Sequence, residues 1–254
     1  MWAEEKTALV TGATSGFGAA VARRIHAGGG RVVALGRRRE RLDALTAEFR
    51  GERIATLAVD LRDMDGIAAA LDKRPAAFEH IDIVFNNSGL ALGLAGAHDA
   101  NLQDWRDMIA TNVSGLVAVT HAILPAMVAR GRGDIVNMSS VAASYPYPGS
   151  NVYGATKAFV RQFSLNLRAD LLGTGLRVTS IEPGMCETEF SLVRFGGNTG
   201  AADKVYAGMI PLNAEDIASS VEFVLRQPPH VNINSLELMS TQQSFGGFAV
   251  SRDG

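Results

Sequence analysis

Hydrophobic residues along the chain gather in short runs, and between these runs they recur every three or four positions. The short runs, typical of β-strands, lie at 6–11, 31–36, 53–60, 81–87, 134–140, 176–184 and 231–239. The stretches with helical periodicity lie at 17–29, 38–49, 63–73, roughly 101–130, 152–172 and 214–226. Strands that alternate with helices of this length indicate βαβ units and a parallel sheet. We therefore predict a single α/β domain over residues 1–254, with a Rossmann-type doubly wound parallel sheet of about seven strands and helices on both faces.

Composition narrows the class of partner and the compartment. The net charge of −2 argues against a nucleic-acid partner and against anionic membrane surfaces. No run approaches about 18 uninterrupted apolar residues, so we expect no membrane span. The N-terminus carries charges where a signal peptide needs apolar residues, and the single cysteine, Cys186, excludes an internal disulfide. A soluble, cytoplasmic protein is the prediction.

Metal ligands are not indicated by the sequence. The histidines are scattered along the chain, at His26, His80, His98, His121 and His230. None pairs with Cys, Asp or Glu at the spacing of metal ligands. We therefore predict no metal site.

A glycine-rich turn, TGATSGFG at 11–18, joins the first strand to the first helix. Glycines allow a tight turn and a close approach to a ligand, and a helix N-terminus offers free N–H groups to a pyrophosphate. The spacing GxxxGxG differs from the common GxGxxG, and such a turn alone is weak evidence. Its place between the first strand and the first helix makes it a candidate nucleotide site, whose candidate contacts are Gly12, Thr14, Ser15, Gly16, Phe17 and Gly18.

The end of the second strand bears on which nucleotide binds. NAD-binding folds usually place an acidic residue there, against the ribose 2′-hydroxyl. Here Gly36 is followed by Arg37, Arg38 and Arg39, and a guanidinium can bind a 2′-phosphate through charge-assisted hydrogen bonds. The alternative is an ordinary solvated helix start, which we assign to Arg39 and Arg41. For Arg37 and Arg38 we predict phosphate contact, and hence NADP rather than NAD.

Tyr153 and Lys157 are four positions apart in a predicted helix, so their side chains share one face. A nearby ammonium favours the phenolate and lowers the pKa of a tyrosine from its usual value of about 10. A tyrosine placed in this way can exchange a proton with a substrate oxygen. The alternative is a chance pair on a solvated helix, which the spacing alone does not exclude.

The motifs taken together resemble the short-chain dehydrogenase/reductase family from about residue 6 to residue 240. The matching elements are TGATSGFG, NNSG at 86–89, Asn112, Ser140, YGATK at 153–157 and PGMCET at 183–188. The resemblance implies that Tyr153 is the general acid or base, and that Lys157 lowers its pKa and binds the nicotinamide ribose. It implies that Ser140, rather than its neighbour Ser139, hydrogen-bonds the substrate oxygen. Asn112 would hold a water that connects Lys157 to solvent.

The resemblance also implies further contacts to the cofactor, NADP(H). They are Asp60 and Leu61 beside the adenine, Asn87, Ser88 and Gly89 after the fourth strand, and Pro183, Gly184 and Thr188 at the nicotinamide. Ser88 departs from the alanine that the family usually has, and its small hydroxyl fits the same space.

Other segments resemble the NADP-dependent 3-hydroxy acid dehydrogenases, which include serine or allo-threonine dehydrogenases and malonic semialdehyde reductases. These segments are GRRRERL, NNSGLALG, NVYGATKAFVRQFSLNLR, TEFSLVRF and HVNINSLELM. Sulfoacetaldehyde reductases of the family share much of this pattern. The implied substrate is a small aldehyde or alcohol that carries an anionic group about two carbons away. The sequence does not separate a carboxylate from a sulfonate.

An anion site is indicated in the expected substrate lid, at about 187–211. Its segment 189–197 carries one cation, Arg194, which could clamp a carboxylate or sulfonate as the lid closes. The alternative is a surface arginine that snorkels from a packed loop. The segment 144–151 would form the opposite wall, with Tyr147 and Asn151 as candidate contacts.

Two further expectations concern catalysis and assembly. A non-catalytic NADP-binding protein is the remote alternative, but such proteins typically lose the Tyr or the Lys, and both are present. The resemblance implies a homotetramer formed through the helices at 101–130 and 152–172. The tail at 241–254 shows little periodicity, so it either packs on a neighbouring subunit or frays.

Overall fold

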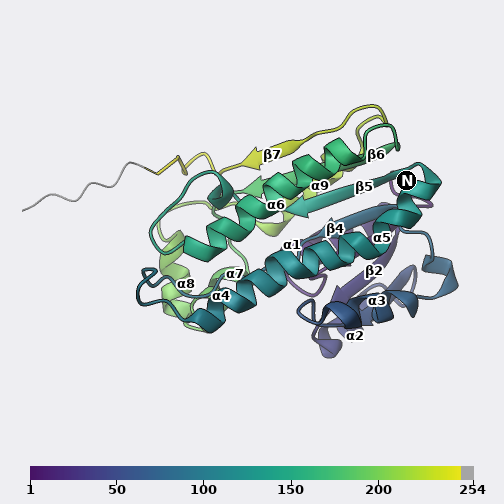
Figure 1. Ribbon diagram of the computed structural model, residues 1–254. Helices are drawn as coiled ribbons and strands as arrows, with labels where there is room; N and C mark the ends of the chain where they lie inside the picture. Colours follow the sequence, from purple (N-terminus) through teal and green to yellow (C-terminus); the bar gives the residue numbers. More distant parts are fainter. Residues whose placement is uncertain (247–254) are drawn as a thin grey trace, which may run out of the picture.

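The computed structural model of the protein describes residues 1–246, apart from the side chains of residues 201–203. Its centre is a parallel sheet of seven strands in the order β3-β2-β1-β4-β5-β6-β7 (Figure 1). The strands are β1 (Thr7–Thr11), β2 (Arg31–Gly36), β3 (Ile54–Ala58), β4 (Ile83–Asn86), β5 (Gly133–Met138), β6 (Leu176–Pro183) and β7 (Ser235–Leu238). The strand order reverses between β1 and β4, and ligands of such sheets bind in the crevice outside this point. The predicted fold class is confirmed.

Helices cover both faces of the sheet. One face carries α1 (Gly16–Ala27), α2 (Arg39–Glu48) and α9 (Ala214–Leu225), whose buried side chains form one core with inward residues of the strands. The other face carries α3 (Met64–Asp72), α5 (Leu116–Arg130) and α6 (Asn151–Asp170) over a second core. Figure 1 views the molecule from the side of α5 and α6. Leu9 and Val10 are neighbours in β1, and they belong to different cores. β1 is therefore buried on both faces rather than on alternate positions.

The long helix predicted at 101–130 consists of three segments. These are α4 (Leu102–Ile109), the π-helical turn η2 (Ala110–Gly115) and α5. A Cβ on Gly115 would lie 2.7 Å from the Leu61 Cβ, so the turn packs tightly on the segment that follows β3. Wide turns of this kind are frequent at functional sites, and this one contains Asn112.

The same segment, Leu102–Arg130, is long and apolar enough to pass a composition test for a membrane span. The sequence-based expectation overlooked it because it considered only uninterrupted apolar runs. The segment packs on the protein's own core through Met108, Val119, Ile123 and Met127, all of which are buried. This packing accounts for its apolar composition.

The region expected as a lid contains two helices that periodicity did not predict, α7 (Glu189–Arg194) and α8 (Thr199–Tyr206). The Thr188 side chain caps α7 by accepting a hydrogen bond from the backbone N–H of Phe190 at 3.2 Å. Two short 3₁₀ turns, η1 (Ala76–Phe78) and η3 (Val141–Ala143), complete the described elements. The last part of the predicted tail, 247–254, lies outside the described residues.

Candidate active site

A cleft of about 700 Å³ follows the carboxyl ends of the strands and brings most of the predicted site residues together. Those that line it are Gly12, Ser15, Gly16, Phe17, Arg37, Arg38, Asp60, Leu61, Asn87, Ser88, Gly89, Ser140, Tyr147, Tyr153, Lys157, Pro183, Gly184, Thr188 and Arg194. Four predicted residues are not in its lining, namely Thr14, Gly18, Asn112 and Asn151. Of these, Thr14, Gly18 and Asn112 pack against residues that do line the cleft.

The glycine-rich turn is shaped by its backbone. Gly12 and Gly16 have φ angles of 65° and 50°, a conformation that favours glycine. A Cβ on Gly18 would lie 2.2 Å from the Gly12 carbonyl oxygen, so Gly18 closes the turn instead of facing the cleft. Thr14 and Ser15 accept hydrogen bonds from the Arg38 guanidinium, at 3.5 and 3.3 Å. The turn therefore also orients an arginine that was predicted to bind phosphate.

The arginines at the end of β2 are available to a ligand. The exposed fractions of the Arg37 and Arg38 side chains are 57% and 41%. Asp60 lies 3.8 Å from Arg37, but its carboxylate is engaged by Arg62 at 2.8 Å, and these hydrogen bonds lower the pKa of Asp60. Asp60 is thus largely neutralised by a residue outside the cleft lining. A bare glycine turn beside two accessible guanidinium groups fits a dinucleotide that carries a 2′-phosphate.

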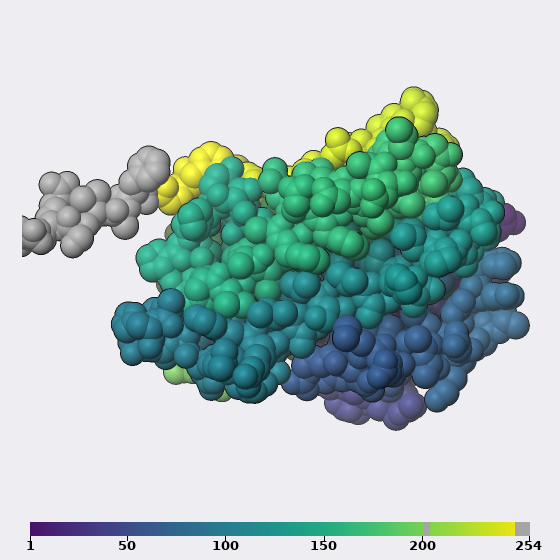
Figure 2. All heavy atoms as spheres, viewed as in Figure 1, coloured from purple at the N-terminus to yellow at the C-terminus, as the bar shows by residue number. Residues whose placement is uncertain are grey.

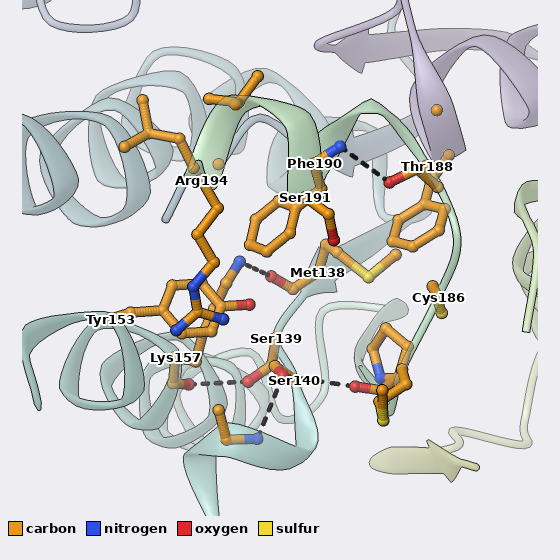
Figure 3. Close-up of a pocket in the computed structure, with 18 of the residues that line it drawn as sticks. Met138, Ser139, Ser140, Tyr153, Lys157, Cys186, Thr188, Phe190, Ser191 and Arg194 are labelled. Atoms are coloured by element: carbon orange, nitrogen blue, oxygen red, sulfur yellow. Dashed lines mark hydrogen bonds between the residues drawn. The ribbon is translucent and has the colours of Figure 1, made fainter. Parts of the chain in front are cut away.

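Three of the four predicted catalytic side chains, Ser140, Tyr153 and Lys157, lie together in the cleft (Figure 3). The Ser140 hydroxyl caps η3 by accepting a hydrogen bond from the Ala142 N–H at 3.1 Å, and it donates to the Pro183 carbonyl oxygen at 3.4 Å. The Ser139 hydroxyl instead donates to the Lys157 carbonyl oxygen at 2.8 Å. Of the two serines, Ser140 is the one that acts on the pKa of Tyr153, which it lowers.

Lys157 and Asn112 converge on Gly89. A Cβ on Gly89 would lie 3.1 Å from the Lys157 Nζ and 3.3 Å from the Asn112 Oδ1. The Asn112 amide donates to the Leu90 carbonyl oxygen at 2.9 Å and to the Thr156 hydroxyl at 3.0 Å. Asn112 is thereby fixed between the loop after β4 and α6, directly behind the lysine.

Burial dominates the electrostatics of this cluster. It raises the pKa of Tyr153, and the hydrogen bond from Ser140 and the charge of Arg194 offset only part of the rise. Burial also lowers the pKa of Lys157 to about 8. The net rise caused by burial is the reverse of the predicted lowering, and Lys157 is not among the groups that act on the pKa of Tyr153. Its ammonium donates to the Met138 carbonyl oxygen at 2.9 Å and lies 5.8 Å from the centre of the phenol ring.

The Arg194 side chain points into the cleft rather than out to solvent (Figure 3). Its Nη1 donates to the Tyr147 hydroxyl at 3.1 Å, and its guanidinium carbon lies 5.7 Å from the centre of the Tyr153 ring. Its Nε and Nη2 are buried without a hydrogen-bond partner among the described residues. Buried polar atoms are nearly always paired, so this geometry is ready for an acceptor supplied by a ligand.

Asn151 does not occupy the wall for which it was predicted. Its Nδ2 donates to the Ala95 carbonyl oxygen at 3.3 Å, and its Oδ1 accepts from the Val152 N–H at 2.7 Å. The residue therefore fixes the start of α6 against the loop after β4. Tyr147, predicted for the same wall, lines the cleft beside Arg194.

Several lining residues were not predicted, among them Tyr145, Tyr206, Gln243 and Phe245. The Tyr206 hydroxyl bonds Ser191 and the Cys186 carbonyl oxygen, each at 2.6 Å, so it fastens α8 to α7 and to the segment that follows β6. Gln243 accepts a hydrogen bond from the Met185 N–H at 2.7 Å. The tail up to residue 246 thus borders the cleft of its own chain. No local motif marks these residues, because their roles arise from contacts between distant segments.

The chain belongs to the short-chain dehydrogenases, a family of oxidoreductases. The model of this family, described as "short chain dehydrogenase", matches residues 6–194. The matched residues include most strands of the parallel sheet and the glycine-rich turn where the strand order reverses. They also include Ser140, Tyr153 and Lys157.

Curated relatives cover nearly the whole chain. It is 56% identical over 247 residues to a serine 3-dehydrogenase of Agrobacterium fabrum, covering 97% of this chain and 98% of the relative. It is 53% identical to an NADP-dependent 3-hydroxy acid dehydrogenase of Salmonella typhi and 51% identical to a sulfoacetaldehyde reductase of Chromohalobacter salexigens, each over 96% of this chain and 98% of the relative. Among solved structures, the closed form of a serine dehydrogenase complexed with NADP+ has a TM-score of 0.95 and 51% identity, covering 97% of this chain and 100% of that one.

The lowered pKa of Lys157 predicts a dependence of stability on pH. Between its folded value of about 8 and its ordinary value of 10.5, the unfolded chain binds more protons than the folded one. The free energy of unfolding of the wild type should therefore rise with pH in this window, relative to the variant Lys157→Met, by up to about 3 kcal/mol. Urea unfolding of both proteins at several pH values measures the difference. The exposed lysine variant Lys73→Met serves as the control, and a difference for Lys157→Met that stays constant with pH would contradict the assignment.

Proposed function

We propose that the protein is an NADP-dependent oxidoreductase that interconverts a small anionic 3-hydroxy acid and its aldehyde or ketone. The observation that carries the proposal is the Arg194 guanidinium beside Tyr153, two of whose buried nitrogens have no hydrogen-bond partner within the part of the chain that the structure describes. An anionic group held there would bring a nearby carbonyl to the tyrosine. The names of the relatives from A. fabrum and S. typhi support this substrate class.

The cofactor would lie along the cleft from the arginines to Tyr153. Arg37 and Arg38 would hold the 2′-phosphate, and the glycine turn of α1 would hold the pyrophosphate. The remaining contacts are those the family resemblance implies: Asp60 and Leu61 at the adenine, Asn87, Ser88 and Gly89 along the middle, and Pro183, Gly184 and Thr188 at the nicotinamide. When bound, NADPH supplies the hydride.

Proton transfer falls to the chain's own residues. In the reductive direction Tyr153 would donate its proton to the substrate oxygen, and its raised pKa keeps it protonated for this step. Ser140 would donate a second hydrogen bond to the same oxygen as negative charge develops there. Lys157, with a pKa of about 8, would return a proton to the tyrosine near neutral pH. Asn112, fixed behind it, would hold a water on the path to solvent.

Reduction of sulfoacetaldehyde to isethionate is the second candidate function. The N–H groups of Arg194 can donate to the oxygens of a sulfonate as well as to those of a carboxylate. The relative from C. salexigens is named as a sulfoacetaldehyde reductase. A protein that binds NADP without catalysis is disfavoured, because Ser140, Tyr153 and Lys157 all line one cleft.

We also infer a homotetramer in the cytoplasm, with residues 187–211 acting as the substrate lid. Support for assembly comes from apolar side chains that are exposed on α4, α5 and α6: Ile109 at 47%, Val128 at 38% and Phe159 at 40%. The last two helices form adjoining parts of the face shown in Figure 2. Exposed apolar residues on neighbouring helices suit burial against a second copy.

The tetramer predicts a mass of four chains by light scattering of the purified protein. Phe159→Glu should reduce that mass, because burying an unpaired carboxylate in an apolar interface is costly. Ala47→Glu adds a carboxylate at an exposed alanine of α2, on the opposite face of the sheet, and is the control that should leave the mass unchanged. A monomeric wild type would contradict the proposed assembly.

The substrate class is tested by NADPH oxidation with malonic semialdehyde and with sulfoacetaldehyde, compared by kcat/KM. Turnover of either is expected, and Arg194→Ala should raise KM about 10- to 100-fold because charge-assisted hydrogen bonds are lost. Propionaldehyde, which lacks the anionic group, is the matched control and should be indifferent to the substitution.

Tyr153→Phe accompanies this series as a check on the acid–base assignment. It should lower kcat by about 10²- to 10⁴-fold and leave NADPH binding nearly intact. Failure of both aldehydes to turn over, or retention of most activity by the Tyr153 variant, would refute the proposed function.

Cofactor choice is tested by replacing Arg37 and Arg38 together with Ala. The affinity for NADPH should fall about tenfold or more while that for NADH changes little, since only NADPH carries the 2′-phosphate. Arg39→Ala is the control, because Arg39 is absent from the lining of the cleft. Titration calorimetry gives both dissociation constants. Equal losses of affinity for NADPH and for NADH would contradict the contact of Arg37 and Arg38 with the 2′-phosphate.

A further inference from the structure

The short lid helix α7 connects two parts of the cleft. It begins at Glu189 and ends at Arg194. The Glu189 carboxylate forms an ion pair with Arg41, whose Nη1 lies 2.9 and 2.8 Å from its two oxygens, and a longer one with Arg38 at 3.8 Å. At its start, α7 therefore carries the Glu189 carboxylate, which faces Arg38 and Arg41. At its end, it carries the Arg194 guanidinium, which lies at the substrate end of the cleft.

The Glu189 contact crosses the mouth of the cleft. Arg38 lines the cleft from the end of β2, and Glu189 lines it from the lid. Arg41 lies on α2, 148 residues earlier in the chain than its partner. The ion pair therefore joins α2 to the lid helix α7.

A displacement at Glu189 should reach Arg194 through the helix between them. Six residues of α-helix span only about 9 Å, and a hydrogen-bonded helix of that length moves as one piece. Its start is fixed by the Thr188 cap, and its middle is held by the bond between Ser191 and Tyr206. The charged contacts of the start of α7 are the ion pairs of Glu189 with Arg41 and, at a longer distance, with Arg38. At the end of the helix, the Gly93 N–H donates to the Arg194 carbonyl oxygen at 3.3 Å.

The charges at the two ends of the helix predict effects of opposite sign. Glu189 is negative and lies near Arg38, which would bind the 2′-phosphate, so its charge competes with the cofactor for this arginine. The same charge holds α7, and with it Arg194, against α2 through Arg41. Neutralising it should favour NADPH and disfavour the anionic substrate.

We propose that Glu189 is a positioning residue that couples the 2′-phosphate site to the placement of Arg194. The coupling rests on the proposed function, since it takes Arg194 as the contact for the substrate anion. It makes the lid sensitive to occupation of the phosphate site, because a phosphate that draws Arg38 away removes one of the two cations that hold Glu189.

The experiment compares Glu189→Gln, which keeps shape and removes charge, with the wild type. Titration calorimetry should give a binary dissociation constant for NADPH that is unchanged or tighter. At saturating NADPH, KM for malonic semialdehyde should rise about two- to fivefold with kcat nearly constant, the range expected for an exposed ion pair. Amide hydrogen exchange over residues 189–194 should become faster. Arg41→Gln should raise KM equally, and the double variant should add nothing further.

Glu187→Gln removes a neighbouring exposed carboxylate and is the matched control, expected to change none of these quantities. If Glu189→Gln weakens the binding of NADPH and raises KM for the substrate together, the role of Glu189 is merely structural and the proposal is overturned. An unchanged KM, or an unchanged rate of amide exchange over residues 189–194, would overturn it as well. Arg194→Ala separates the two levels of inference. If it leaves KM unchanged, the proposed function fails; if it raises KM and Glu189→Gln does not, only the coupling is wrong.

Discussion

The site depends on the close contact between the carboxyl ends of β1 and β4. The Thr11 hydroxyl accepts hydrogen bonds from the backbone N–H groups of Asn87 and Ser88, at 2.9 and 3.0 Å. The side-chain amide of Asn87 also donates to the Thr11 carbonyl oxygen. Since the strand order reverses between these strands, the helices diverge on either side of this contact and open a crevice. Gly12 must pass next to Asn87 without a side chain, because a Cβ there would lie 2.8 Å from the Asn87 Nδ2. The same hydrogen bonds therefore shape the glycine turn and the segment that leads to Gly89, where Lys157 and Asn112 converge.

Burial then sets the chemistry at the other end of the crevice. It favours the neutral form of both members of the Tyr–Lys pair, raising the pKa of Tyr153 and lowering that of Lys157 to about 8. A tyrosine that holds its proton suits the role of acid, and a lysine that titrates near neutral pH suits the role of proton relay. Both residues line the cleft as the sequence predicted, but a rule based on charge alone left out the cost of burying the phenolate, which raises the pKa of Tyr153.

The parts of the fold that were predictable are those encoded within a few residues. Strands such as β1 are apolar on both faces, and pairs such as Arg37 with Arg38 are adjacent in sequence. The helix α7 was missed because six residues are too few for periodicity, and what stabilises it is a cap and a contact with Arg41 across the cleft. Gln243 was missed for a related reason, since its partner Met185 lies 58 residues away. Asn151 was misassigned because a position in sequence next to a wall of the site does not fix the direction of a side chain.

The geometry of Arg194 also bears on the choice between the two substrate classes. Tyr147 already occupies its Nη1, which leaves Nε and Nη2 open on one edge of the guanidinium. That edge presents two parallel N–H donors, the arrangement that matches the two oxygens of a planar carboxylate. A sulfonate can use the same two donors, but its third oxygen then needs a partner of its own or stays unpaired at a cost. The Tyr147 hydroxyl is bonded to the Nη1 of the same guanidinium, and it can donate its hydrogen while it accepts from Arg194. The fork by itself therefore favours a carboxylate, and a sulfonate would rely on Tyr147 as well.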